Sequence, residues 1–244
     1  TIVDMAYMLS PDQLLWCVRS DGALLSMAYV PEHQVYGWSQ HFTDGLFESV
    51  CVVTEDNEDV LYAVVKRNLN GSDVRCIERM ASRRFATQDD AFFVDCGLTY
   101  SGAPATTISG LAHLEGETVT ILADGAVVAD QVVTGGAITL PVAASTVHIG
   151  LPFNMDVQLL PVAVDSAEAG GQGTIKNVDY SYIRVNRSGP LYAGPSFDDL
   201  VQIPIRTNEP YGSPPRLQSR TLDIFIQPPD AEQALDAQLC VRSS

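Results

Sequence analysis

Basic residues are scarce in this sequence. Its 244 residues include 14 Lys plus Arg against 30 Asp plus Glu, which gives a formal net charge of −16. Sequence-independent nucleic-acid binding needs clustered Lys and Arg, so this charge balance argues against it. Some arginines do gather with an acid between them, which favours a solvated face with local ion pairs. They are Arg75, Arg79, Arg83 and Arg84, interrupted by Glu78.

An acidic surface is, however, what a conduit for passing DNA needs, because repulsion prevents the DNA from sticking to the wall. Acidity alone does not establish such a conduit, since many globular proteins are acidic.

Metal-ligand spacing and long apolar runs are also absent. No C-x-x-C pair occurs, and an odd number of cysteines argues against a complete intrachain disulfide framework. We interpret the five cysteines as reduced, small buried hydrophobes. They are Cys17, Cys51, Cys76, Cys96 and Cys240. No apolar run approaches the roughly 18 residues of a membrane span, so none is expected.

Catalytic signatures are missing as well. The chain has no G-x-S-x-G elbow, and its four histidines show no helical metal-ligand spacing. We therefore predict no enzymatic activity and no cofactor.

Helical periodicity is almost missing, whereas strand signals are frequent. Apolar and polar residues alternate at 35–42, 118–121 and 146–149, which is typical of half-buried strands. Asp21-Gly22, Asn70-Gly71 and Asp124-Gly125 supply the positive φ angles that tight hairpins need. The sequence predicts an all-β protein.

Two of the predicted hairpins resemble each other. Leu-Leu-Trp-x-Val at 14–18 recurs as Val-Leu-Tyr-x-Val at 60–64, 46 positions further along. That offset is close to the ~40–45 residues of a four-stranded propeller blade. Two copies are weak evidence, so a propeller-like body and a generic sandwich stay open alternatives.

Composition divides the chain into three segments. Residues 1–97 carry the blade-like hairpins and form the expected body. Charged residues thin out over 98–164, which predicts a small inserted β-barrel or tip module. Residues 165–244 are expected to be return strands of the body with Pro-rich loops, because prolines at this density belong to loops and edge strands.

Two groups of residues are candidate functional sites. The acidic run Glu55, Asp56, Glu58 and Asp59 lacks the Gly and the distal Glu of an EF-hand loop, so we interpret it as a solvated hairpin connection. In a conduit it would be a channel-facing acidic loop. The tyrosines in or near the Pro-rich loops are candidates for subunit contacts, since Tyr is enriched at interfaces. They are Tyr180, Tyr182, Tyr192 and Tyr211.

Four aromatics of the first segment could form a sugar platform. We interpret them instead as core residues, because aromatics inside alternating strands are usually buried. They are Trp16, Tyr36, Trp38 and Tyr62.

Several stretches resemble the tail nozzle family of short-tailed bacteriophages, whose members include tail tubular and packaged-DNA-stabilisation proteins. In the body they are Leu-Trp-Cys-Val-Arg-Ser-Asp-Gly at 15–22, Tyr-Gly-Trp-Ser-Gln-His at 36–41, Val-Val-Lys-Arg-Asn-Leu-Asn-Gly at 64–71 and Ile-Glu-Arg at 77–79. In the module they lie at 110–116, 122–125 and 147–152, and in the last segment at 204–207 and 239–243. Together they span nearly the whole chain and correspond to the C-terminal portion of such proteins.

The resemblance implies a structural viral protein in the virion tail, assembled in the bacterial host cytoplasm. It implies a homo-oligomeric ring, usually a hexamer, that forms part of the conduit for genome ejection without binding DNA specifically. It also implies docking of a tail adaptor and of fibre or spike proteins, and it brings no catalytic residue.

Two other functions compete with this one. Small β domains with exposed aromatics commonly bind glycans, so a host-attachment module is the alternative. A weaker one is a tail-associated polysaccharide depolymerase that uses Asp198 and Asp199 with Glu209 as its acidic pair.

Overall fold

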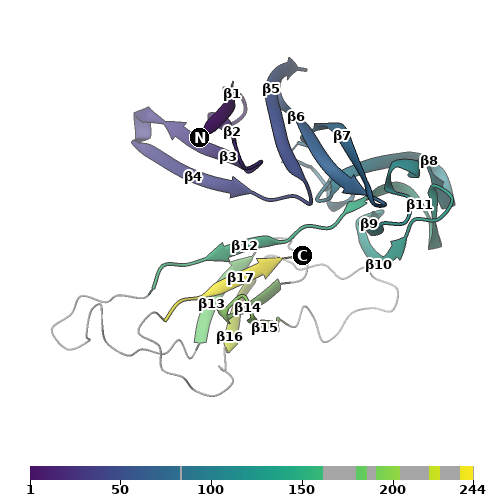
Figure 1. Cartoon of the computed structure of the whole chain (residues 1–244). Helices are drawn as coiled ribbons and strands as arrows, with labels where there is room; N and C mark the ends of the chain where they lie inside the picture. Colours follow the sequence, from purple (N-terminus) through teal and green to yellow (C-terminus); the bar gives the residue numbers. More distant parts are fainter. Residues whose placement is uncertain (83, 162–179, 186–190, 204–219, 226–236, 244) are drawn as a thin grey trace. The chain divides into compact units, whose positions relative to one another are not determined.

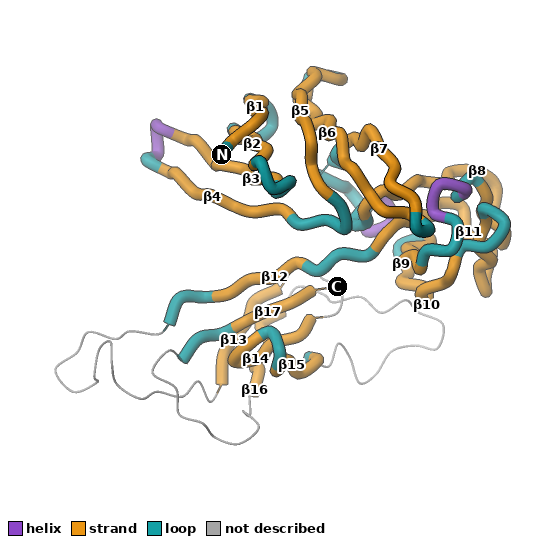
Figure 2. The backbone as a smooth tube through the Cα atoms, in the orientation of Figure 1, coloured by secondary structure: helices purple, strands orange, loops and turns teal. Residues whose placement is uncertain are grey.

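The computed structural model describes residues 1–82, 84–161, 180–185, 191–203, 220–225 and 237–243. The chain divides into two compact units, Thr1–Phe153 and Asn154–Ser244, and each is described by itself. Strands dominate the described residues, where the helical turns are three short 3₁₀ segments (Figure 2). They are Pro31–His33, Gln88–Asp90 and Ala112–Leu114. The all-β prediction is confirmed.

The first four strands form one antiparallel sheet, here called the first meander. They are β1 (Ile2–Met8), β2 (Leu14–Arg19), β3 (Leu24–Val30) and β4 (Val35–His41), and they pair in chain order (Figure 1). Pairing in chain order needs only short connections, and it leaves β1 and β4 as the edges of the sheet.

The next three strands form the second meander, again in chain order. They are β5 (Leu46–Glu55), β6 (Glu58–Leu69) and β7 (Ser72–Arg79). The two similar sequence stretches, 14–18 and 60–64, lie in β2 and β6, which are the second strands of their sheets. The repeat therefore relates equivalent strands of two meanders, and antiparallel sheets of this kind form the blades of propellers.

The two meanders share a core. Its buried members are Met8, Leu14, Trp16, Val18, Leu24, Val50, Leu61, Ala63 and Val65. Burying a side chain of this size contributes about 1.5–3 kcal/mol to stability. Asp4 reinforces the contact, because its Oδ2 accepts hydrogen bonds from the Val50 amide at 3.0 Å and from the Ser49 hydroxyl at 2.7 Å. These bonds lower the pKa of Asp4.

The hairpin turns follow from paired residues with positive φ. Asn70-Gly71 has φ of 48° and 75°, and Asp124-Gly125 has 46° and 73°. Two positive φ angles in succession are the mark of a two-residue type I′ turn, whose twist matches that of the flanking strands. Both turns were predicted. A third pair, Asp56-Asn57, has φ of 46° and 68° without any glycine.

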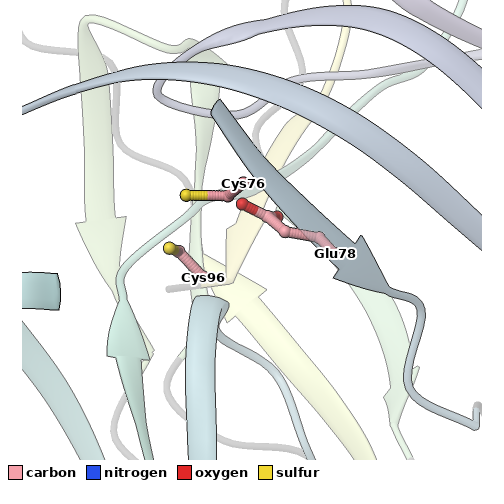
Figure 3. A group of neighbouring side chains, drawn as sticks. All are labelled: Cys76, Glu78 and Cys96. Atoms are coloured by element: carbon pink, nitrogen blue, oxygen red, sulfur yellow. The ribbon is translucent and has the colours of Figure 1, made fainter. Parts of the chain in front are cut away.

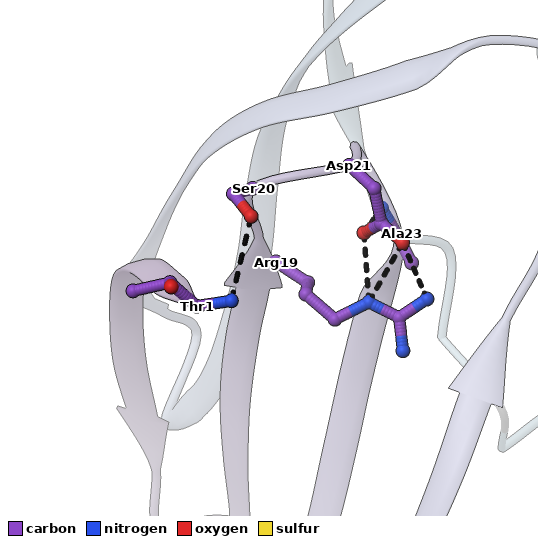
Figure 4. A network of polar contacts seen from close by, with 5 residues as sticks. All are labelled: Thr1, Arg19, Ser20, Asp21 and Ala23. Atoms are coloured by element: carbon purple, nitrogen blue, oxygen red, sulfur yellow. Dashed lines mark hydrogen bonds and ion pairs between the residues drawn. The ribbon is translucent and has the colours of Figure 1, made fainter.

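Asp21 carries the predicted turn between β2 and β3. Its carboxylate accepts hydrogen bonds from the Arg19 guanidinium at 2.6 to 2.9 Å, and the Thr1 amine lies 3.4 Å from the Ser20 hydroxyl (Figure 4). The hydrogen bonds from Arg19 lower the pKa of Asp21 to about 2. The turn thus keeps its ion pair over the whole range in which free carboxyls are ionised.

Four further strands form the long-strand sheet, in the order β10-β9-β11-β8. They are β8 (Asp95–Ser109), β9 (Thr118–Ala123), β10 (Ala126–Val132) and β11 (Ala137–Leu151). Their buried apolar residues form a second core that also contains Leu69 from the end of β6. The second meander therefore packs against both neighbouring sheets of its unit, and Figure 1 shows it between them.

A β-bulge lies at the start of β8. The register shifts there, so that Cys96 and Gly97 lie opposite Gly150. Cys96 has a φ of 47°, which few non-glycine residues adopt. A Cβ on Gly150 would lie 2.6 Å from the Asp95 carbonyl oxygen, and a Cβ on Gly97 would lie 2.5 Å from that of Ile149. Only glycine permits this close approach of the two strands.

The unit Asn154–Ser244 contains a second set of sheets. Its four-stranded sheet has the order β12-β17-β14-β15, and a separate ribbon pairs β13 with β16. The strands are β12 (Met155–Gln158), β13 (Tyr180–Val185), β14 (Leu191–Ser196), β15 (Asp199–Gln202), β16 (Arg220–Phe225) and β17 (Cys240–Ser243). Arg242 donates two hydrogen bonds of 2.7 Å to the Asp156 carboxylate and so ties β17 to β12.

The strands divide the chain at a different place from the composition. The long-strand sheet occupies 95–151. It begins just before the segment predicted as the inserted module, 98–164, and otherwise lies within it. β12 lies inside the same predicted segment, 98–164, yet it pairs with β17 in the other unit. Composition follows apolar content, whereas hydrogen-bond pairing decides which sheet a strand joins.

No helix in the described part of the chain is long and apolar enough to cross a membrane.

Replacing Gly150 by alanine tests the bulge. The added Cβ would meet the Asp95 carbonyl oxygen at 2.6 Å and the Gly97 Cα at 2.8 Å. Overpacking of this kind typically costs about 1–3 kcal/mol, so we expect a loss of that size in the free energy of unfolding. Urea denaturation followed by tryptophan fluorescence measures it, because Trp16 and Trp38 are the only tryptophans and both lie in this unit.

Gly37→Ala is the matched control. Gly37 lies in β4, and no atom comes within 4 Å of a Cβ built on it. We expect no loss of stability in this variant. Equal effects of the two substitutions would show that the close approach at the bulge is not what requires glycine.

Candidate functional site

The outer face of the first meander is mostly apolar, with Gln40 and Arg19 as its polar residues. Alternation along each strand places Leu14, Trp16 and Val18 on the face that packs against the second meander. The cross-strand pairing places eight other apolar residues on the opposite face, here called the aromatic face. They are Met5, Tyr7, Leu15, Leu25, Met27, Tyr29, Tyr36 and Trp38.

Aromatic rings on this face are solvent-exposed along the edge strand β4. Tyr36 is 60% exposed and Trp38 is 58% exposed, and the Tyr36 ring packs at 5.7 Å from that of Tyr29. The core interpretation is correct for Trp16, which is 1% exposed, and wrong for Tyr36 and Trp38. Alternation identifies the two faces of a strand, but it does not say which face is covered.

The acidic run forms the β5–β6 hairpin. Asp56 is exposed at its tip, and Glu55 pairs with Glu58 across the ladder. The Glu55 carboxylate accepts hydrogen bonds from the Arg79 guanidinium at 2.7 and 3.0 Å and from the Tyr62 hydroxyl. These bonds, from Arg79 first, lower the pKa of Glu55. The run is a hairpin connection, as interpreted from the sequence, but Glu55 is paired and not merely solvated.

Asp59 anchors a different segment to this hairpin. Its Oδ2 accepts hydrogen bonds from the amides of Leu9 at 2.8 Å and Ser10 at 3.2 Å, and its Oδ1 accepts one from the Thr54 hydroxyl at 2.7 Å. Together these bonds, that from Leu9 first, lower the pKa of Asp59. Two of the four acids thus hold the scaffold, and whether the loop faces a channel stays a prediction.

A shallow cavity of about 190 Å³ lies beside the hairpin. Acids and arginines line it together, among them Asp12, Asp59, Arg79 and Arg84. Arg79 in this lining is already paired with Glu55.

The predicted contact tyrosines differ in their surroundings. Tyr182 in β13 is 62% exposed, as a contact residue of an isolated chain would be, whereas Tyr192 in β14 is half-buried. Tyr180 lies at the start of β13, but its side chain lies outside the described residues, as does all of Tyr211. Their role in subunit contacts stays a prediction.

The residues of the depolymerase alternative are only partly described. Asp198 is exposed in the turn between β14 and β15, and Asp199 begins β15. Glu209 lies outside the described residues. The depolymerase alternative therefore stays a prediction.

Sequence reasoning missed a cluster of two thiols and a carboxylate. Cys76 and Glu78 lie on the same face of β7, two residues apart, and Cys96 reaches them from the bulge of β8. One ligand atom of each residue, two Sγ and one carboxylate oxygen, lies within 4.8 Å of the others (Figure 3). Cys76 and Cys96 are twenty positions apart, and no local spacing signals that they meet.

Arg67 lies beside this cluster and is 1% exposed. Its Nε and Nη2 donate to the two carboxylate oxygens of Glu78 at 2.5 and 2.7 Å, and its Nη1 donates to the Asp44 carbonyl at 2.6 Å. Such a bidentate ion pair is the arrangement that best offsets the cost of burying a guanidinium.

The surroundings of the cluster keep the Cys96 thiol protonated. Burial, the Glu78 carboxylate and the Cys76 thiol together raise the pKa of Cys96 to about 12. Burial also raises the pKa of Asp95, against the opposing effect of a 2.5 Å hydrogen bond from the Thr43 hydroxyl. The Cys96 thiol is therefore a poor nucleophile at neutral pH.

No protein-family model matches the chain, and no curated protein matches it significantly.

Replacing single acids of the hairpin by their amides distinguishes an acid that anchors another segment from one that is only solvated. Asp59→Asn removes the charge that the Leu9 and Ser10 amides stabilise, so we expect a lower urea midpoint at neutral pH. A free Asp has a pKa of about 3.9, and the folded pKa of Asp59 is lower. The stabilisation is therefore present above about pH 4 and is lost as the pH falls through the folded pKa, where the two proteins should converge.

Asp56→Asn is the control for this measurement. Asp56 is exposed at the hairpin tip, and asparagine tolerates its φ of 46°. We expect the same midpoint as in the parent protein at every pH. A midpoint for Asp59→Asn that equals the parent value at neutral pH would contradict the anchoring role of Asp59.

Proposed function

We propose that the protein is a structural component of the tail of a short-tailed bacteriophage. In this proposal it forms part of a nozzle or hub ring through which the genome leaves, and it catalyses no reaction. The single observation that supports the proposal most strongly is the aromatic face of the first meander, a mostly apolar sheet face that is exposed in the isolated chain.

A sheet with one solvated face alternates apolar and polar residues, whereas a sheet buried on both faces is apolar throughout. The aromatic face of the first meander is closer to the second pattern, because Gln40 is its only polar residue in the centre and on the β4 edge of the sheet, and yet this face is exposed in the isolated chain. Exposed apolar patches of this kind mark interaction surfaces. A structural subunit of a ring needs such a surface, and further copies of the same chain are its expected partners.

The charges support a conduit. The net charge of −16 repels a polyphosphate chain, and Asp56 and Glu58 at the tip of the β5–β6 hairpin offer carboxylates to anything that passes. In the proposed ring this hairpin faces the channel, DNA passes without specific binding, and the adaptor and fibre or spike proteins dock elsewhere on the subunit.

Glycan binding is the second candidate, and the aromatic face is again the reason. Tyr29, Tyr36 and Trp38 form a row of rings on two neighbouring strands, and sugars stack on such rows. Both functions use the same residues, so one set of variants tests them together.

Trp38→Lys combined with Tyr36→Lys tests the assembly proposal. We expect the parent chain to self-associate with rising concentration in sedimentation velocity, and the double variant to stay monomeric, because a charge on this face must be desolvated on association. Val142→Lys is the control, since Val142 is 74% exposed on β11, outside the first meander. A parent chain that stays monomeric at high concentration would contradict the proposal.

The same proteins on a glycan array address the second candidate. Saturable binding to a sugar by the parent chain and by Val142→Lys, lost in the double variant, would favour the attachment module. An antibody against the chain should label the tail end of virions if the structural proposal is correct, and label elsewhere would count against it.

The channel-facing role of the hairpin needs the assembled virion. Asp56→Asn combined with Glu58→Gln removes charge at the tip and retains the anchoring acids Glu55 and Asp59. We expect particles to assemble normally and to eject DNA more slowly, because the wall repels the genome less. Ejection at the parent rate, measured by DNA release after triggering, would contradict this orientation of the loop.

A further inference from the structure

The cluster of Cys76, Glu78 and Cys96 combines ligand types that occur together in metal sites. Its three ligand atoms lie within 4.8 Å of one another. A small inward movement of the three side chains would bring these atoms to the separation that ligands of one ion have. A tetrahedral zinc site has Zn–S distances of about 2.3 Å and Zn–O distances of about 2.0–2.2 Å. No other group of three or more such ligands occurs among the described residues.

The backbone positions the two thiols independently of each other. Cys76 lies within the regular pairing of β6 with β7, and Cys96 is turned toward it by the bulge at the start of β8. The glycines opposite and beside Cys96 have no room for a Cβ, so the bulge is a fixed feature. Bulges commonly redirect a side chain at functional sites.

The bond between Glu78 and Arg67 is compatible with a metal ligand. Each carboxylate oxygen has two lone pairs, and the two hydrogen bonds from Arg67 use one on each oxygen. A lone pair therefore remains for an ion on the oxygen near the thiols. Hydrogen-bonded partners behind a ligand normally orient it, and Arg67 takes that position here.

We propose that Cys76, Cys96 and Glu78 bind one thiophilic divalent ion of the zinc class. Two thiolates with one carboxylate select zinc over the hard ions calcium and magnesium, which take oxygen ligands. Binding replaces the protons of the two thiols, and both protons pass to solvent as the two sulfur–metal bonds form. The ion joins β7 to β8 and so fastens the second meander to the long-strand sheet, which is a role separate from the proposed function.

Titration of the reduced full chain with Co²⁺ tests this site. We expect one equivalent to bind, with a sulfur-to-cobalt charge-transfer band in the near ultraviolet that Zn²⁺ abolishes by displacement. Cys76→Ser and Cys96→Ser should each lower Zn²⁺ affinity by at least roughly 100-fold, the upper end of what loss of an outer partner costs. Cys51→Ser is the matched control, since Cys51 is an exposed thiol on β5.

A second measurement does not depend on how the variants fold. X-ray absorption by the zinc-loaded parent chain should show two sulfur atoms at about 2.3 Å. A shell of only nitrogen and oxygen, a band that persists in both single variants, or its loss in Cys51→Ser would overturn the proposal. So would a reduced chain that takes up no Co²⁺ while oxidation with a small disulfide links Cys76 to Cys96, because the cluster would then be a thiol pair.

Discussion

One buried guanidinium links separate segments of the unit Thr1–Phe153. Arg67 on β6 bonds to Glu78 on β7 and to the carbonyl of Asp44, in the connection that leads from β4 to β5. The charge of Asp95, at the start of β8, acts on the same group. Removing one partner of a buried pair typically costs about 3–5 kcal/mol, a large part of the ~5–15 kcal/mol that keeps a domain folded. Arg67 therefore links the second meander to the β4–β5 connection, beside the apolar cores that the sheets share.

Several acids of the unit Thr1–Phe153 are structural groups. Asp4 joins β1 to β5, Asp21 closes the β2–β3 turn, and Asp59 anchors the end of β1. Each of them has a lowered pKa because amides, hydroxyls or arginine stabilise its charged form. An acidic protein can therefore be well ordered, and the acids left at exposed tips such as Asp56 set the field that a passing polyanion meets.

The sequence predicts local structure better than it predicts which surfaces meet. Asn70-Gly71 and Asp124-Gly125 identify their turns because positive φ is a property of those residues, and the all-β class follows from alternation. The exposure of Tyr36 and Trp38 was missed because it depends on what covers the edge strand β4, and nothing in the strand itself encodes that. The meeting of Cys76 with Cys96 was missed for a similar reason, since it results from a bulge and from the packing of two sheets.

The second of these failures lies where several local rules break together. Local rules hold along most strands, and they break where a non-glycine residue takes positive φ at Cys96, a carboxyl is half-buried at Asp95, and a guanidinium is buried at Arg67. Natural proteins keep such unfavourable features mainly where function or assembly requires them. All three lie at the junction of the second meander with the long-strand sheet, beside the two thiols. An ion at this point would offset part of the cost, because it would turn a cluster of partly buried polar groups into a bonded link between sheets.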